Sequence, residues 1–188
     1  MKVSYNKRII IVISSPSGAG KTSVCQKLIE RDKSIALSIS DTTRSPRDNE
    51  IDGVDYNFIE EEEFKNNIIN KSYVEHANVF GNFYGSQYKN IINHFKSGRD
   101  VLFDIDWQGA KQLKSSAFKN IVSIFIIPPS KDAIYQRLKS RAITSGDNEE
   151  AIESRMNKYE TEMRHRNDYD YIVINDKLET CVDELERI

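Results

Sequence analysis

The chain has 188 residues, of which 38% are hydrophobic and 30% are charged, a balance that excludes an extended disordered protein and predicts one globular domain. Lysine and arginine total 27 against 29 aspartate and glutamate, so a net charge of -2 gives no support to a nucleic-acid or anionic-membrane partner. The longest apolar run, 9–13, is far shorter than a membrane span of roughly 20 residues, and no signal-peptide pattern is seen, so we expect a cytoplasmic location.

The first predicted elements are a buried strand and a helix. Residues 8–14 form a β-branched run that is too short for a helix and ends at the turn signals Pro16 and Gly18. From Lys21 onward, apolar residues follow helical spacing at Val24, Cys25, Leu28 and Ile29. We expect Cys25, like Cys181 in a later helical pattern, to be a reduced packing residue. The predicted order is strand, glycine-containing loop, helix.

Residues 15–22, between this strand and this helix, have the pattern of a phosphate-binding loop. They match G-x-x-x-x-G-K-[ST] except at the first position, and read Ser15, Pro16, Ser17, Gly18, Ala19, Gly20, Lys21 and Thr22. A bare G-K-[ST] is common, but a position directly after a buried strand and at the start of a helix is the context that the motif requires. We therefore expect these eight residues to bind ATP, and we expect Ser15 to keep a negative φ because it has a Cβ.

The residue types of this loop suit a nucleoside triphosphate. Gly18 and Gly20 allow backbone N–H groups to converge on phosphate oxygens, and the start of the helix adds positive potential. Lys21 supplies a full positive charge, and Thr22 offers a hydroxyl to the Mg²⁺ that accompanies ATP. The alternative, a glycine turn that only starts a helix, would not need the lysine.

Residues 40–86 differ in composition from the rest of the chain. They are rich in tyrosine, phenylalanine, asparagine, glycine and charge, with short extended pieces such as 56–59, and we interpret them as an inserted subdomain. Further apolar runs with the length of strands are 101–105, 121–127 and 171–174. Helical spacing marks the segments 88–95, 152–163 and 178–185. Strands that alternate with helices predict an α/β fold with a parallel core sheet flanked by helices.

Five segments together resemble the signature of guanylate kinases. They are SISDTTRSPR at 38–47, GVDYNF at 53–58, YVEHA at 73–77, GNFYGS at 81–86 and DIDWQG at 104–109. The resemblance runs from about residue 8 to about residue 176, in the same order and with nearly the same spacing. It implies an enzyme that transfers the terminal phosphoryl group of ATP to GMP or dGMP with Mg²⁺ as cofactor.

The resemblance also implies the organisation of the chain. It indicates a single domain over residues 1–188 with a P-loop kinase core, a GMP-binding subdomain and a helical lid. The core comprises about 1–39, 98–130 and 166–188, the subdomain about 40–97, and the lid about 131–165. The polar stretch 144–148 between two predicted helices is then the tip of a mobile lid.

The acceptor site follows from the resemblance, position by position. The residues that match the family's GMP site are Ser40, Arg44, Arg47, Tyr56, Glu75, Tyr84, Ser86 and Asp106. In the family the two arginines and two tyrosines hold the phosphate, and these donors suit a dianion. Glu75 matches the residue that holds guanine, with the two serines completing that pocket. One carboxylate accepts both N–H donors of guanine, whereas adenine would turn a lone pair toward it.

The expected catalytic residues lie in three parts of the chain. They are Lys21, Arg44, Asp104, Asp106, Arg137 and Arg141. The two aspartates end a predicted strand, where the family has acidic residues near the phosphates, metal and acceptor; otherwise they are surface carboxylates. Arg137 and Arg141 lie four residues apart on one helix face and match lid arginines, as does Arg155 on the next helix, although helical arginines are often only solvated. Asn175 matches a residue near the adenine of ATP, or else it caps the last helix.

The sequence departs from the family at Ser15 and in the stretch 142–148, which is a few residues longer than usual. Two other functions remain open. One is a nucleoside monophosphate kinase for AMP, UMP or TMP, against which Glu75 argues. The other is the non-catalytic scaffold domain of membrane-associated guanylate-kinase homologues, which binds phosphorylated protein segments, and Lys21 and Thr22 argue against it. The sequence makes no prediction of oligomeric state.

Overall fold

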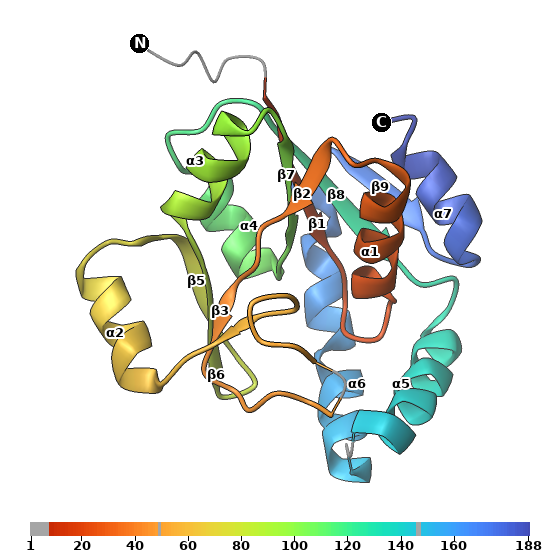
Figure 1. Ribbon diagram of the computed structural model, residues 1–188. Helices are drawn as coiled ribbons and strands as arrows, with labels where there is room; N and C mark the ends of the chain where they lie inside the picture. Colours follow the sequence, from red (N-terminus) through yellow and green to blue (C-terminus); the bar gives the residue numbers. More distant parts are fainter. Residues whose placement is uncertain (1–7, 49, 146–147) are drawn as a thin grey trace.

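Five parallel strands form the sheet on which the other elements pack (Figure 1). In this computed structural model, which describes residues 8–48, 50–145 and 148–188, the strand order is β2-β7-β1-β8-β9. The strands are β1 Ile10–Ser14, β2 Ile35–Leu37, β7 Asp100–Asp104, β8 Ile121–Ile127 and β9 Tyr171–Ile174. All four pairings are parallel, as expected where helices connect the strands. The predicted α/β fold with a parallel core sheet is confirmed, and β8 and β9 have the predicted bounds.

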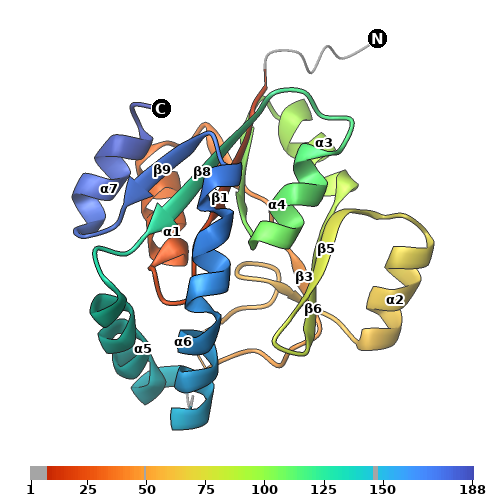
Figure 2. The same cartoon turned by 180° about the vertical axis from the view of Figure 1, so that it is seen from behind.

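The two faces of this sheet bury different helices, because side chains alternate along β1. Ile10 and Val12 join a core with α3 and α4, whereas Ile13 joins a core with α1 and α7. These helices are α1 Lys21–Arg31, α3 Tyr88–Lys96, α4 Trp107–Lys114 and α7 Leu178–Leu185. Figures 1 and 2 show the two pairs on opposite sides of the sheet. Cys25 and Cys181 are free and buried in the second of these cores, as predicted.

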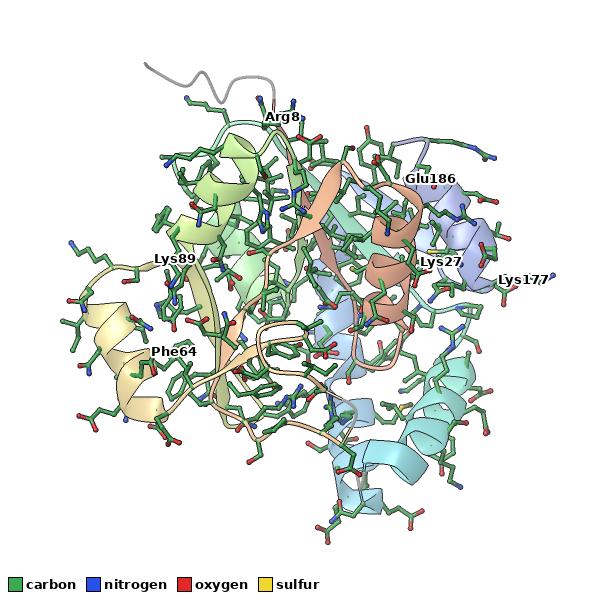
Figure 3. The ribbon with its side chains drawn as sticks, viewed as in Figure 1. Arg8, Lys27, Phe64, Lys89, Lys177 and Glu186 are labelled. Carbon is green, nitrogen blue, oxygen red and sulfur yellow. The ribbon has the colours of Figure 1, made fainter. Side chains whose placement is uncertain are left out.

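A second sheet, with the order β4-β3-β6-β5, stands beside the first. Its strands are β3 Asp41–Thr42, β4 Asn57–Phe58, β5 Tyr73–Val79 and β6 Asn82–Gln87. Helix α2 (Glu61–Ile69) covers it through Phe64, which is fully buried and stacks on Tyr73 and Phe83 at centroid distances of 4.6 and 5.4 Å. Figure 3 shows Phe64 pointing from α2 toward this sheet.

Two helices extend beyond the carboxyl ends of the core strands (Figure 1). They are α5 Lys131–Ser145 and α6 Glu149–Arg164, followed by the short 3-10 helix η1 His165–Asp168. Ile134, Leu138 and Ile152 form a small buried cluster of their own between them. The loop predicted at 144–148 is shorter than expected, because Thr144 and Ser145 belong to α5 and Asn148 caps α6. Residues 146–147 lie outside the described part of the chain.

Several short elements had no counterpart in the sequence analysis. Strands β2 and β3 contain three and two residues, too few for an alternating pattern to be recognised. Strands β5 and β6 form an antiparallel pair with a register shift near Tyr73, and their polar composition resembles that of a loop. Helices α2 and α4 each bury only a few residues, so their apolar periodicity is weak. None of the helices in the described residues combines the length and apolar character that a membrane crossing requires.

Candidate active site

A cavity of about 970 Å³ opens at the carboxyl ends of the core strands, between the two sheets and the helices α5 and α6. Residues from all three parts line it, among them Lys21, Glu75 and Arg137. Most residues predicted from the sequence meet here. Ala19 and Ser86 are fully buried and are not among the residues that line the cavity. Arg141 belongs to α5, but its side chain is outside the described part of the structure.

The phosphate loop has the backbone that its glycines permit. Gly18 and Gly20 have φ values of 86° and 87°, in the left-handed region, and Gly20 is the residue before the first turn of α1. Ala19 donates its N–H to the carbonyl of Pro16 at 3.1 Å, which closes the turn. Ser15 is not among the positive-φ residues of the described chain, so a serine fits where the common motif has glycine.

Lys21 and Thr22 both contact Asp104, the last residue of β7. Lys21 forms an ion pair with this carboxylate and donates to the carbonyl of Ile105 at 3.1 Å. Thr22 Oγ1 donates to Asp104 Oδ2 at 2.9 Å. Burial alone would lower the pKa of Lys21, but Asp104 raises it above the ordinary lysine value, so the ammonium group stays charged. The alternative that Asp104 is only a surface carboxylate is therefore wrong.

The back of the loop is held by residues from the far end of the chain. Asn175, which is 5% exposed, donates its side-chain amide to the carbonyl of Ala19 at 2.8 Å. Arg137 donates to the same carbonyl at 3.1 Å and to the carbonyl of Asn175 at 2.8 Å. The alternative that Asn175 caps the last helix is wrong, because Lys177 precedes α7 and makes no side-chain cap bond.

Two residues of α6 reach the front of the loop. Arg155 donates to Ser17 Oγ at 3.2 Å, which brings the third predicted lid arginine to the cavity. Glu162 Oε2 accepts the backbone N–H of Ser17 at 3.0 Å. Burial raises the pKa of Glu162, and the Ser17 N–H opposes that rise. Glu162 was not predicted, and no local motif identifies it, since it lies 145 residues from its partner.

Arg44 and Arg47 are held by a carboxylate that the sequence analysis did not name. Arg44 makes a bidentate pair with Glu50, with both N–O distances 2.6 Å. Glu50 also accepts the backbone N–H of Arg47 at 2.8 Å and its guanidinium at 3.2 Å. Burial would raise the pKa of Glu50, but the bond to Arg44 lowers it, so the carboxylate is ionised. Glu50 lies three residues after Arg47, and this spacing could have identified it from the sequence as a partner of the arginine.

Two tyrosines stand beside these arginines. The Arg44 guanidinium lies 4.9 Å from the centre of the Tyr56 ring, and Tyr56 and Tyr84 meet edge to face at 5.9 Å. Burial, with the nearby Asp104, raises the pKa of Tyr56 to about 12, so its phenol keeps its proton and can donate. Two cations and two neutral donors on one wall make this part of the cavity suited to a dianion.

Glu75, on β5, is the most deeply buried acid of the cavity, with 3% of its surface exposed. Its Oε1 has no hydrogen-bond partner within residues 8–48, 50–145 and 148–188. Burial raises the pKa of Glu75 to about 7; Asp106 adds to the rise and Ser86 opposes it. Ser40 and Ser86 share a buried hydrogen bond of 2.9 Å. An acceptor without a donor, on a residue that lines the cavity, suits a ligand that brings N–H groups.

Asp106 lies at the start of α4 and is not a detached surface acid. Its Oδ1 accepts the N–H of Gly109 at 3.0 Å and its Oδ2 accepts the amide of Gln108 at 2.9 Å, so it caps the helix. Within the described residues, no group of three or more histidine, cysteine, aspartate or glutamate side chains is arranged to hold a metal ion by itself.

Comparison with known proteins gives one consistent answer. The sequence model of the family described as guanylate kinase matches residues 7–188. A guanylate kinase of Rickettsia bellii is 47% identical over 186 residues, which cover 99% of this chain and 95% of the relative. A guanylate kinase of Paramagnetospirillum magneticum is 44% identical over 180 residues, with 96% and 83% covered. The crystal structure of guanylate kinase from Anaplasma phagocytophilum superposes with a TM-score of 0.76 at 36% identity, covering 96% of this chain and 83% of that one.

Proposed function

This chain belongs to the guanylate kinase family and transfers the terminal phosphoryl group of ATP to GMP, and from that premise we propose which residues bind each nucleotide and which act in the transfer. ATP binds at the phosphate loop, GMP binds against the second sheet, and the lid helices close over both. The proposed parts are a core of about 1–39, 98–130 and 166–188, a GMP-binding subdomain of about 40–97, and a lid of about 131–165. The acceptors are GMP and dGMP, and the expected location is cytoplasmic.

The observation that carries this proposal is the buried carboxylate of Glu75, whose Oε1 has no hydrogen-bond partner in the described residues and which lines the same cavity as the phosphate loop. A guanine base brings two adjacent N–H donors, which one ionised carboxylate accepts together, and Ser40 and Ser86 complete the pocket. An adenine in the same place would turn the lone pair of a ring nitrogen toward the carboxylate, and the two would repel each other. Rejection of the wrong base therefore comes from the same group that binds the right one.

The donor side is assigned to the loop 15–22 and to Asp104. Lys21 is a charged donor to the phosphates, and Asn175 and Arg137 hold the loop carbonyl behind it. The residues suit Mg²⁺, because Thr22 and Asp104 offer hard oxygen ligands 2.9 Å apart and Mg²⁺ takes few protein ligands beside phosphates. When bound, Mg²⁺ neutralises charge that develops on the phosphates during transfer.

The acceptor side is assigned to Arg44, Arg47, Tyr56 and Tyr84, which hold the GMP phosphate. Because this phosphate is itself the nucleophile, no general base is required. Lid closure is proposed to carry Arg137, Arg141 and Arg155 toward the transferring group and to exclude water, which would otherwise accept it. Catalysis then consists of positioning and charge stabilisation, with Asp106 orienting the acceptor side.

The test is ADP formation with a panel of monophosphates, namely GMP, dGMP, AMP, UMP and TMP, with ATP and Mg²⁺. We expect turnover with the two guanine nucleotides and little with the others. A preference for AMP would contradict the assignment of Glu75. Binding of GMP without any turnover of ATP would instead favour the scaffold function, and Lys21→Ala serves as the inactive reference for that comparison.

A further inference from the structure

Gly109 lies at a helical position where the backbone conformation does not require glycine. It lies in the first turn of α4, and its φ is not among the positive values of the described glycines, so it does not need the conformational freedom of that residue. Alanine is the better helix former at such a position. The reason for a glycine must therefore lie in what surrounds it.

The space beside Gly109 is filled by the Glu75 side chain. A methyl group at this position would overlap Glu75 Oε2 and would lie 3.1 Å from Glu75 Cδ and 3.4 Å from Ile105 Cδ1. The atom in the way is the tip of a side chain, whereas the backbone of both elements is further off. A substitution here would therefore displace the carboxylate before it displaced the helix.

The helix cannot move back to make room. Gln112, one turn further along α4, makes two hydrogen bonds with the backbone of His76, the residue that follows Glu75 on β5. Its amide donates to the His76 carbonyl at 2.6 Å, and its Oε1 accepts the His76 N–H at 3.2 Å. At the start of the helix, Asp106 accepts the Gly109 N–H at 3.0 Å, a bond that lies within α4 itself. The bonds between Gln112 and His76 therefore hold α4 against β5 one turn beyond the contact.

The position of this carboxylate decides what it can bind. Oε2 lies against Gly109, and Oε1 is buried with no hydrogen-bond partner in the described residues. Ser86 is hydrogen-bonded to this carboxylate, but no donor in the described residues meets Oε1 itself, so packing also has to set the direction of the group. The side-chain-free surface of Gly109 is the wall against which Oε2 rests, on a residue that lines the cavity.

We propose that Gly109 is a specificity-determining position, which sets the Glu75 carboxylate at the distance and angle that recognise guanine. The proposal rests on the assignment of Glu75 to the guanine base made above. Gly109 touches no substrate; it acts by positioning Glu75. Its effect should accordingly appear in the discrimination between nucleobases and not in the use of ATP.

The first measurement is the KM for GMP and for ATP, with the thermal midpoint, in Gly109→Ala. We expect the KM for GMP to rise about tenfold and the ratio of kcat/KM for GMP over AMP to fall, as one charge-assisted contact is misplaced. The KM for ATP and the thermal midpoint should stay near their wild-type values. Lys111→Ala, an exposed change on the same helix, is the matched control and should alter none of these quantities.

The second measurement is a double-mutant cycle with Glu75→Asp, whose shorter side chain leaves room for a methyl group. Adding Gly109→Ala to Glu75→Asp should change the KM for GMP by less than about twofold, whereas it costs about tenfold when Glu75 is present. If Gly109→Ala weakens GMP and ATP alike and lowers the thermal midpoint, or fails to fold even together with Glu75→Asp, the position serves the fold and the proposal is wrong.

Glu75→Gln separates this proposal from the one on which it rests. If Glu75→Gln leaves the preference for GMP over AMP intact, the assignment of Glu75 to guanine fails, and with it both proposals. If Glu75→Gln loses that preference but Gly109→Ala keeps it, only the role of Gly109 fails. Loss of the preference in both variants, with ATP use retained, is the expected result.

Discussion

The two regions that we propose to bind phosphate are built in different ways. The donor loop, 15–22, is held by residues from distant parts of the chain: Asn175 is 156 positions from its partner, Glu162 is 145 and Arg155 is 138. The acceptor arginines are held by a neighbour, since Glu50 is six positions from Arg44 and three from Arg47. We assign both regions to phosphate groups, but one depends on the tertiary fold and the other on a short segment.

This comparison distinguishes a site whose supporting residues lie in the same short segment from a site whose supporting residues are brought to it by the fold. Around Arg44 the sequence contains both the cations and the anion that orders them. Around Lys21 it contains the donors, while the groups that fix the loop are supplied by α5, by α6 and by the residue that follows β9. Changes in the donor loop's supports should therefore alter ATP use alone, and changes near Arg44 should alter GMP use alone.

The largest effect should come from Lys21→Ala. Loss of a charged donor to the transferring phosphates, worth about 3 kcal/mol, should lower kcat about a hundredfold with little change in the KM for GMP. Lys27→Ala is the control, because Lys27 lies on the same helix (Figure 3) but pairs with Glu30 and Glu179 and does not line the cavity. Steady-state kinetics measure both, and a kcat within twofold of the wild type would contradict the role of Lys21.

The next largest effect is expected for Glu50→Gln. The change keeps the size of the side chain but removes the charge that orients Arg44 and Arg47, and the KM for GMP should rise about thirtyfold, equivalent to about 2 kcal/mol, with the KM for ATP unchanged. Glu61→Gln, exposed on α2, is the matched control. Tighter GMP binding in Glu50→Gln would mean that this carboxylate competes with the phosphate, contrary to our interpretation.

A third test uses the pKa of Glu75, which burial raises to about 7. Guanine needs the ionised carboxylate, so ionisation is nearly complete at pH 8 and mostly lost at pH 6, and the KM for GMP should rise about tenfold between them. The phosphate of GMP titrates near pH 6 as well. In Glu75→Gln the GMP phosphate still titrates but the carboxylate is gone. Any pH dependence of the KM for GMP that the wild type shows and this variant lacks is therefore due to Glu75.

The same shift has a consequence for stability. A carboxyl group whose pKa is higher in the folded than in the unfolded state stabilises the fold below its unfolded pKa and loses that contribution as the pH rises through about 7. Glu75→Gln should therefore raise the thermal midpoint at pH 8 more than at pH 5. An equal change at both values would mean that the buried carboxylate has an ordinary pKa.

The smallest effect is expected for Asn175→Ala. The neutral hydrogen bond to Ala19 contributes about 1 kcal/mol, and Arg137 still donates to the same carbonyl, so the KM for ATP should rise about fivefold. The KM for GMP should not change, because no acceptor residue contacts this amide. A rise in both constants would show that the two regions are not independent.

The sequence specified the parts that have strong local patterns. The strands at 121–127 and 171–174 and the phosphate loop followed from apolar runs and turn residues. Burial explains the apolar run of β8, whereas β9 lies at the edge of the sheet and buries only Val173. Strands β2 and β3 and helix α2 were not predicted, since two or three residues, or one buried phenylalanine, carry no periodicity. Short elements of this kind form because the rest of the fold brings partners to them.

The same distinction applies to the site. Most of the predicted site residues followed from motifs or from the family resemblance. The contact of Glu162 with Ser17 and that of Asn175 with Ala19 depend on distances across the fold that sequence spacing does not reveal. Gly109 lies within a motif that was recognised, yet its relation to Glu75 becomes visible only when the two elements are placed side by side. Glu50 was within reach of sequence analysis, because it follows the two arginines closely.

The bond between Asn175 and Ala19 also bears on how the protein is made. A chain emerging from the ribosome can complete the second sheet once residue 87 is available, and domains fold as their segments appear. The phosphate loop has to wait until β9 has docked beside β8 and brought Asn175 to it. Contacts of such sequence separation form late. Support for the phosphate loop is therefore completed only after β9 has been made, and premature termination near residue 170 would release a chain that lacks both this strand and Asn175.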